Sequence, residues 1–390
     1  MPRRSKASAV RVPPPHFPPS DYDSTRTACC TAEDVEMADK VTPHKGPPQG
    51  EATDGASKRQ NSERNAKRWK AEIFGRIVEP TPEIETFLEE FVPSDDSHLD
   101  CLDTEFMAEV PAVEGKELTM YGPLVEGLTS LVRNFPEEKR PVFSNHAHKT
   151  MRFPFAMCDD EEHSTMPDVT ATIPGLPCIP PVDRWRNVVL VFEAKATATQ
   201  DPMVRYTEHH EKTLVQLAMS ARNIMLAQGR LFAFVVGIYG HEARIFRFDR
   251  AGAISSPLFN YVTEPQHLHN FLWRFLNPVE EDCLVVGDDP TSTLGTHEDR
   301  QLVQDLTAAH DPEYEYTQEN RKAVRRFVVH HGENDKTEYL AYKLISVNPR
   351  LFSRATKGQS IGEFWTAGLK SLAPSPEHQT DHHHSDKMVD

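Results

Sequence analysis

The chain has 390 residues, 31 prolines, a mean hydropathy of −0.56 and a formal net charge of −16. This length and polarity favour one compact domain with long polar tails. Residues 1–70 carry 13 Lys or Arg and 9 Asp or Glu, which leaves 30 basic and 50 acidic residues for the other 320, and such an acidic balance makes nucleic acid an unlikely partner of the domain as a whole.

The sequence contains no run of about 18 apolar residues, so it predicts no membrane span. The start, Met1-Pro2-Arg3-Arg4, leads into prolines rather than into an apolar signal core, and none of the six cysteines forms a CxxC pair. We therefore expect an intracellular protein, in the cytoplasm or the nucleus.

Four segments differ in composition. Residues 1–68 are rich in Pro, Ser and charged side chains and are expected to form a disordered tail. Residues 69–285 are expected to form the main module, and residues 286–357 a linker with the first strands of a second unit. Residues 358–390 read as a divergent polar tail that includes three adjacent histidines.

Two amphipathic helices are predicted first. In residues 82–91 the side chains of Ile84, Phe87, Leu88 and Phe91 share one helical face. Residues 119–135 repeat the pattern and carry Glu126 beside the apolar stripe. Both helices precede the first predicted strands of the module.

The remaining elements alternate strands and helices. The pattern predicts strands at 168–173 and 188–195, a helix at 206–228, a hairpin of 231–239 with 243–248, and a helix at 267–276. Residues 287–295 are rich in turn formers, and strands are expected at 327–329 and 339–347. The fold class indicated is α/β, with α+β as the alternative, built on a mixed sheet flanked by helices.

One group of residues could carry chemistry. In the apolar strand 188–195, Glu193 and Lys195 are two residues apart and therefore point to the same face. Asp168 begins the preceding strand and would lie beside Glu193 if the two strands pair. Two neighbouring carboxylates repel, and a divalent cation such as Mg²⁺ relieves that repulsion. The alternative is a structural salt bridge between Glu193 and Lys195.

The arrangement of Pro167-Asp168, 24 further residues and Glu193-Ala194-Lys195 resembles the PD-(D/E)XK signature of restriction-endonuclease-like nucleases. The resemblance implies that Asp168 and Glu193 hold Mg²⁺ and that Lys195 orients or activates the attacking water. It also gives supporting roles to Glu126, on the helix before the strands, and to Gln216, on the helix after them.

A second resemblance rests on three stretches: residues 185–195, residues 216–252 with the run Phe248-Asp249-Arg250-Ala251-Gly252, and residues 344–356. Together they resemble the N-terminal region of basidiomycete fungal-type protein kinases, over about residues 70–357. The Asp249 to Gly252 run is expected to form a turn that ends a strand, with a positive φ at Gly252. The resemblance implies that residues 286–357 are a linker and the first strands of an incomplete kinase-like small lobe, with residues 351–356 resembling the entry into that lobe.

The resemblance implies ATP-dependent protein phosphorylation in full-length relatives. Phosphoryl transfer needs an HRD-like catalytic loop and a DFG-like metal-binding motif, and neither motif occurs in this sequence. The sequence therefore predicts a truncated or mis-spliced form without kinase activity of its own, and ATP is expected only for the longer relatives.

Three hypotheses follow from these observations. The first is a non-catalytic N-terminal module of a kinase-family protein. The second is a divalent-metal-dependent nuclease that uses Asp168, Glu193 and Lys195. The third is a protein-interaction module whose basic N-terminal arm docks to an acidic protein partner.

Overall fold

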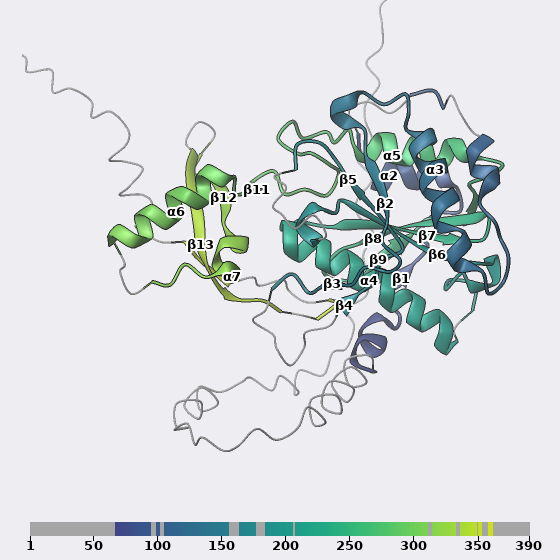
Figure 1. Cartoon of the computed structure of the whole chain (residues 1–390), viewed down its shortest axis with the longest axis horizontal. Helices are drawn as coiled ribbons and strands as arrows, with labels where there is room; N and C mark the ends of the chain where they lie inside the picture. Colours follow the sequence, from purple (N-terminus) through teal and green to yellow (C-terminus); the bar gives the residue numbers. More distant parts are fainter. Residues whose placement is uncertain are drawn as a thin grey trace, which may run out of the picture. The chain divides into compact units, whose positions relative to one another are not determined.

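A computed structural model describes residues 67–94, 99–101, 105–155, 164–176, 184–205, 207–310, 314–332, 336–348, 350–352 and 358–361. The predicted disordered tail, up to residue 66, and the polar tail beyond residue 361 lie outside the described residues. The largest unit is an eight-stranded sheet in the order β1-β9-β8-β7-β6-β5-β2, with β10 paired to β8 (Figure 1). Its strands are β1 (Ile77–Val78), β2 (Val142–Asn145), β5 (Val169–Thr172), β6 (Leu190–Lys195), β7 (Ala233–Tyr239), β8 (Glu242–Phe248), β9 (Ala253–Ser255) and β10 (Phe259–Asn260).

The sheet is mixed, because most neighbouring strands run antiparallel whereas β6 pairs with β7, and β1 with β9, in parallel. A parallel pair needs a crossover connection, and helix α4 (Glu208–Gln228) provides it between β6 and β7. The predicted α/β fold with a mixed sheet flanked by helices is confirmed.

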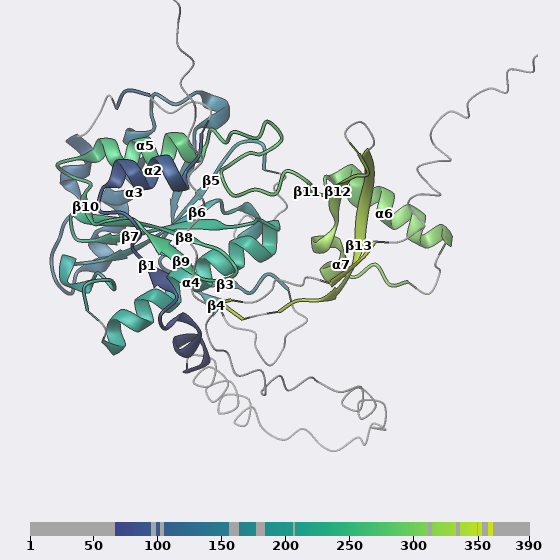
Figure 2. The ribbon, with the colours of Figure 1, turned by 180° about the vertical axis from the view of Figure 1, so that it is seen from behind.

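Helices cover both faces of the sheet. Figures 1 and 2 show α2 (Ile84–Phe91), α3 (Tyr121–Leu131) and α5 (Pro265–Phe275) on one face and α4 on the other. Along β6, Leu190 and Phe192 belong to the core beneath α2, α3 and α5, whereas Val191 packs with α4. Because side chains alternate along a strand, Glu193 and Lys195 project toward the face that α4 covers.

Helix α4 is capped at both ends by neighbouring residues. The Thr207 hydroxyl accepts a hydrogen bond from the His210 N–H at 3.4 Å, and Gly229 ends the helix with φ of 71°. A side chain at position 229 would occupy the space of the Arg325 guanidinium, which donates a hydrogen bond to the Gln228 carbonyl. The C-terminal end of α4 is thereby bonded to strand β12.

Two smaller sheets accompany the large one. A four-stranded antiparallel sheet contains β11 (Ser292–Leu294), β12 (Arg325–His330), β13 (Lys336–Ser346) and β14 (Gly358–Ile361), with α6 (His297–His310) and α7 (Gln318–Ala323) beside it in sequence. A two-stranded sheet pairs β3 (Met151–Arg152) with β4 (Ser164–Thr165). Short 3₁₀ turns are η2 (Glu105–Glu109), η3 (Glu117–Thr119), η4 (Glu137–Lys139), η6 (Trp185–Asn187) and η7 (Ala198–Gln200).

The predicted helices and strands are present with shifted ends. The helical stripe of residues 82–91 became α2, where Ile84, Phe87 and Leu88 are buried and Phe91 is half-buried. The turn-rich segment 287–295 differs from expectation, since its last residues form β11. Helices α6 and α7 and the short strands β2, β9 and β10 were not predicted from the sequence.

The prediction for Gly252 is wrong in its geometry. Gly252 is not among the glycines with positive φ. The turn is instead closed by the Asp249 carboxylate, which accepts hydrogen bonds from the N–H groups of Ala251 at 2.8 Å and Gly252 at 3.0 Å. A Cβ at position 252 would collide with the Arg76 carbonyl oxygen, so glycine is required here by a close backbone approach.

None of the helices in the described part of the chain combines the length and the apolar composition that crossing a bilayer requires.

Candidate carboxylate–lysine site

The pairing of β5 with β6 brings the predicted residues together. Val169 pairs with Phe192 in an antiparallel register, so Asp168, just before β5, lies opposite Glu193. The Asp168 carboxylate accepts a hydrogen bond from the Ala194 N–H at 2.8 Å. Asp168, Glu193 and Lys195 therefore share the sheet face that α4 covers.

Glu193 and Lys195 form an ion pair in which Lys195 Nζ lies 3.0 Å from Glu193 Oε1. Only 3% of Glu193 and 7% of Lys195 is exposed, and Asp168 is 8% exposed. Such burial without partners would be costly, so the three charges depend on one another.

Burial dominates the electrostatics of the cluster. Burial and the nearby charge of Asp168 raise the pKa of Glu193 to about 7. Burial also raises the pKa of Asp168 above its ordinary value, although Lys195 and the Ala194 N–H act against this. For Lys195, burial lowers the pKa, but Glu193 and Asp168 outweigh burial and the pKa ends above its ordinary value. Lys195 therefore remains an ammonium ion at neutral pH, while Glu193 is poised to gain or lose a proton.

Two further residues, from η3 and from the start of α3, lie next to the cluster. The Tyr121 hydroxyl, at the start of α3, is hydrogen-bonded to Asp168, and burial followed by the Asp168 charge raises the pKa of this phenol well above its usual value. Glu117, in η3, accepts a hydrogen bond from Gln200 Nε2 at 3.3 Å and adds negative charge near Asp168, Glu193 and Lys195.

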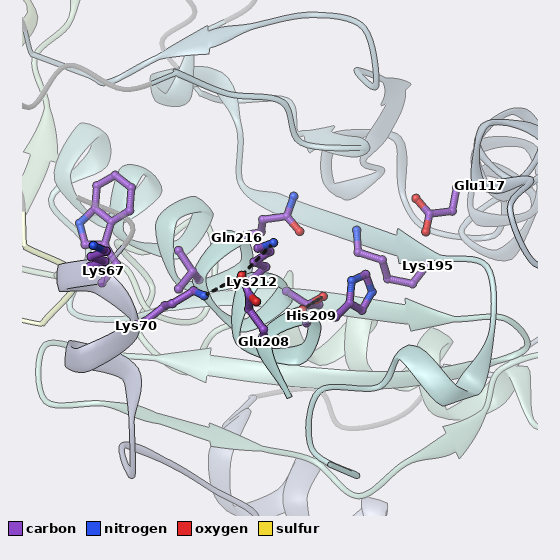
Figure 3. A pocket seen from close by; sticks show the side chains of 11 residues that line it. Lys67, Lys70, Glu117, Lys195, Glu208, His209, Lys212 and Gln216 are labelled. Atoms are coloured by element: carbon purple, nitrogen blue, oxygen red, sulfur yellow. Dashed lines mark hydrogen bonds and ion pairs between the residues drawn. The ribbon is translucent and has the colours of Figure 1, made fainter. Parts of the chain in front are cut away.

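Lys195 also lines a pocket of about 690 Å³. Its walls include Glu117 and a polar stripe of α4 formed by His209, Lys212 and Gln216 (Figure 3). Lys67 and Lys70, from the helical residues 67–73, line the pocket as well. Part of this charge is paired, because Glu208 lies 3.3 Å from Lys212 and 3.6 Å from Lys70. The lining is richer in basic than in acidic side chains, in contrast to the acidic chain as a whole.

The two predicted supporting residues lie in different surroundings. Gln216 lines the same pocket as Lys195. Glu126 is exposed and lies five residues beyond Tyr121 on α3, which turns it to a different side of the helix, and it is not among the pocket residues. Of the two glutamates in η3 and α3, Glu117 lies next to the cluster and Glu126 does not.

The residues that sequence reasoning missed are Glu117, Tyr121, His209 and Lys212. His209, Lys212 and Gln216 recur at spacings of three and four, so the helical period that gave the apolar face of α4 also contains this polar face. Glu117 lies in a single 3₁₀ turn, which has no periodic signal.

The site has oxygen donors of the kind that Mg²⁺ prefers, in Asp168 and Glu193. Within the described part of the chain, no three His, Cys, Asp or Glu side chains are arranged as a ready metal site. One oxygen of Glu193 is engaged by Lys195 and one of Asp168 by the Ala194 N–H. A cation would therefore be held by the remaining carboxylate oxygens and by water.

Comparison with known protein families finds that residues 181–358 match the family model described as fungal protein kinase. The match spans less than half of the chain and supports the predicted kinship with the kinase family. It begins shortly before η6 and ends at the start of β14, so it takes in β6, α4 and most of both larger sheets. No curated protein matches the chain.

Proposed function

We propose that this chain acts as a module of a fungal-type protein kinase that accompanies phosphoryl transfer without catalysing it. The observation that carries the proposal is the content of the matched segment, residues 181–358. Its first part is a mixed sheet with a parallel β6–β7 pair and a crossover helix, and its sequence has neither the HRD-like nor the DFG-like motif that phosphoryl transfer uses. Its last part, β11 to β13, is the segment that would lead into a kinase small lobe.

The test is a phosphoryl-transfer assay with the purified 390-residue chain. With Mg-ATP and a mixture of protein acceptors, we expect no phosphate incorporation above a heat-inactivated sample, because the sequence has no HRD-like or DFG-like motif. An active protein kinase in parallel checks the acceptors. Metal-dependent phosphorylation by this chain would overturn the proposal.

A second candidate is divalent-metal-dependent cleavage of phosphodiesters, which the grouping of Asp168, Glu193 and Lys195 beside a lysine-lined pocket favours. Mg²⁺ held by Asp168 and Glu193 would polarise the phosphorus-bound oxygens of the substrate. The Lys195 ammonium would bind and orient a phosphate oxygen or donate a proton to a leaving group, since its raised pKa keeps it charged. The pKa of about 7 for Glu193 describes the chain without a cation, and Mg²⁺ on this carboxylate would lower it.

The pocket changes one inference drawn from composition. A chain of net charge −16 disfavours nucleic acid globally, yet Lys67, Lys70, Lys195 and Lys212 make this one surface locally basic. A phosphodiester substrate is thus compatible with the pocket, although not with the chain's overall charge. The structural alternative, in which Glu193 and Lys195 only stabilise the fold, predicts that no substrate is cleaved.

Cleavage assays on single- and double-stranded DNA and RNA decide between these readings. We expect Mg²⁺-dependent cleavage that Glu193→Ala abolishes and that Glu117→Ala reduces. Glu126→Ala is the matched control, because it removes an exposed acid of α3 that does not line the pocket. No detectable cleavage of any of the four substrates removes this candidate.

A further inference from the structure

A second pocket of about 330 Å³ lies near the opposite end of β6, beside η6. Its lining is basic and aromatic and includes Arg152, Phe153, Arg184, Trp185, Arg186 and Lys322. Among the described residues that line it, none is Asp or Glu. The described lining of this cavity, here named the arginine pocket, is therefore cationic.

Arg186 is held firmly in this wall. Its Nη1 donates to the Lys322 carbonyl and its Nη2 to the Gly295 carbonyl, both at 2.9 Å. The residue is 6% exposed, and its Nε is buried without a hydrogen-bond partner. A buried guanidinium with an unused donor marks a place where an acceptor is missing.

The surroundings of Arg186 add positive charge. Burial and the charges of Arg300, Arg325 and Arg184 lower the pKa of Arg186 to about 9, and among the strongest influences only Tyr316 acts in the other direction. Two other buried arginines are paired with acids: Arg230 lies 2.9 Å from Asp288, and Arg244 lies 2.8 Å from Asp201. Arg186 differs from these two, because its side-chain hydrogen bonds go to neutral carbonyl groups and it forms no ion pair with a described residue.

We propose that the arginine pocket binds a phosphate monoester carried on an aromatic ring, the chemistry of a phosphotyrosine side chain. Guanidinium groups bind phosphate oxygens in pairs, which would supply the acceptor that Arg186 lacks. Phe153, Phe155 and Trp185 give the same cavity apolar walls that suit a flat ring. The inference concerns a different pocket from the carboxylate–lysine site and does not depend on the function proposed for that site.

Calorimetric titration of the full chain tests this assignment. The probes are phenyl phosphate, N-acetyl-phosphotyrosine amide, inorganic phosphate, phenol and AMP. We expect saturable 1:1 binding of the two aryl phosphates, at least about tenfold tighter than binding of inorganic phosphate or phenol, since only they offer both charge and ring. Absence of saturable aryl phosphate binding overturns the proposal, and tighter binding of AMP than of the phosphotyrosine amide overturns the choice of ligand.

Charge-reversal variants locate the binding. Arg184→Glu is expected to weaken aryl phosphate binding at least about tenfold, and its side chain is half-buried, with only its backbone carbonyl used in η6. Arg205→Glu is the matched control, because Arg205 is exposed and lies beyond the other end of β6. Arg152→Glu serves as a second pocket variant should Arg184→Glu fail to fold. Equal affinities in the wild type and both pocket variants would place the ligand elsewhere and overturn the proposal.

Discussion

The buried charges near the two ends of β6 have different kinds of partner. At the C-terminal end, Lys195 lies against Glu193, and Asp168 and Glu117 add further negative charge. Near the N-terminal end, Arg186 lies among Arg184, Arg300 and Arg325, and its hydrogen bonds go to neutral carbonyls. Lys195 is paired with a carboxylate, whereas Arg186 is bonded to neutral groups, and for this reason we call the two ends compensated and uncompensated. A compensated cluster should govern stability, whereas an uncompensated one should respond to an added anion.

Removing the cation from the compensated end should have the largest effect. Lys195→Met leaves Glu193 and Asp168 buried without their positive partner, and we expect it to lower the free energy of unfolding by about 4 kcal/mol at pH 8. The loss should be smaller at pH 6, because Glu193, whose pKa is about 7, is then mostly protonated. Urea denaturation at the two pH values measures it.

Lys212→Met is the control for this substitution. Lys212 lines the same pocket, but its side chain is 63% exposed and it pairs with an exposed glutamate. The expected change is below about 0.5 kcal/mol. A loss for Lys195→Met that is as small as this, or that is equal at both pH values, would show that the cluster is not held by charge.

The pH dependence of stability should be the next largest effect. The pKa of Glu193 is raised to about 7 in the folded chain, above its value in the unfolded chain. Its contribution is therefore complete below the unfolded pKa and is lost as the pH rises through about 7, and we expect this group to cost about 2 kcal/mol between pH 5 and pH 8. Glu193→Gln should flatten the unfolding free energy over that interval.

Unfolding free energies of the two proteins at four pH values between 5 and 8 provide the measurement. Glu126→Gln, which changes an exposed glutamate, should keep the slope of the wild type. An unchanged slope in Glu193→Gln would mean that another group titrates in this range.

At the uncompensated end the effect on stability should be smaller and independent of pH. Arg186→Met removes the hydrogen bonds to the Lys322 and Gly295 carbonyls, the second of which still accepts from Arg300, and it also relieves repulsion with Arg184, Arg300 and Arg325. We expect a net loss of about 1 kcal/mol that is the same at pH 6 and pH 8, because the lowered pKa of Arg186, about 9, still lies above both values. Urea denaturation at both pH values checks this, and a loss above about 3 kcal/mol would contradict the picture of mutual repulsion.

The sequence predicted the compensated end better than the other one. Glu193 and Lys195 are two residues apart on an apolar strand, so the period of the strand alone indicated a shared face. Asp168 needed one further assumption, that strands close in sequence pair, and β5 does pair with β6. Glu117 was not predicted because an isolated 3₁₀ turn has no periodic pattern in the sequence.

The uncompensated end left no local pattern at all. Arg186, Arg300 and Arg325 are more than 100 residues apart at their extremes and meet only through the contacts between η6 and the elements around β11 and β12. The helices α6 and α7 were missed for a related reason, since their few apolar side chains do not form a long stripe. Neither the arginine cluster nor the two helices could be predicted from local sequence patterns.

Gly229, which ends α4, affects how the small sheet and α4 separate when the protein unfolds. Its missing side chain leaves the opening through which Arg325 reaches the last turn of the helix. Pulling β12 away would break this bond and uncover the Gln228 carbonyl, so the small sheet and the crossover helix should come apart in one cooperative step rather than as independent pieces. A larger residue at position 229 would displace the Arg325 guanidinium, and the small sheet and α4 should then unfold in separate steps.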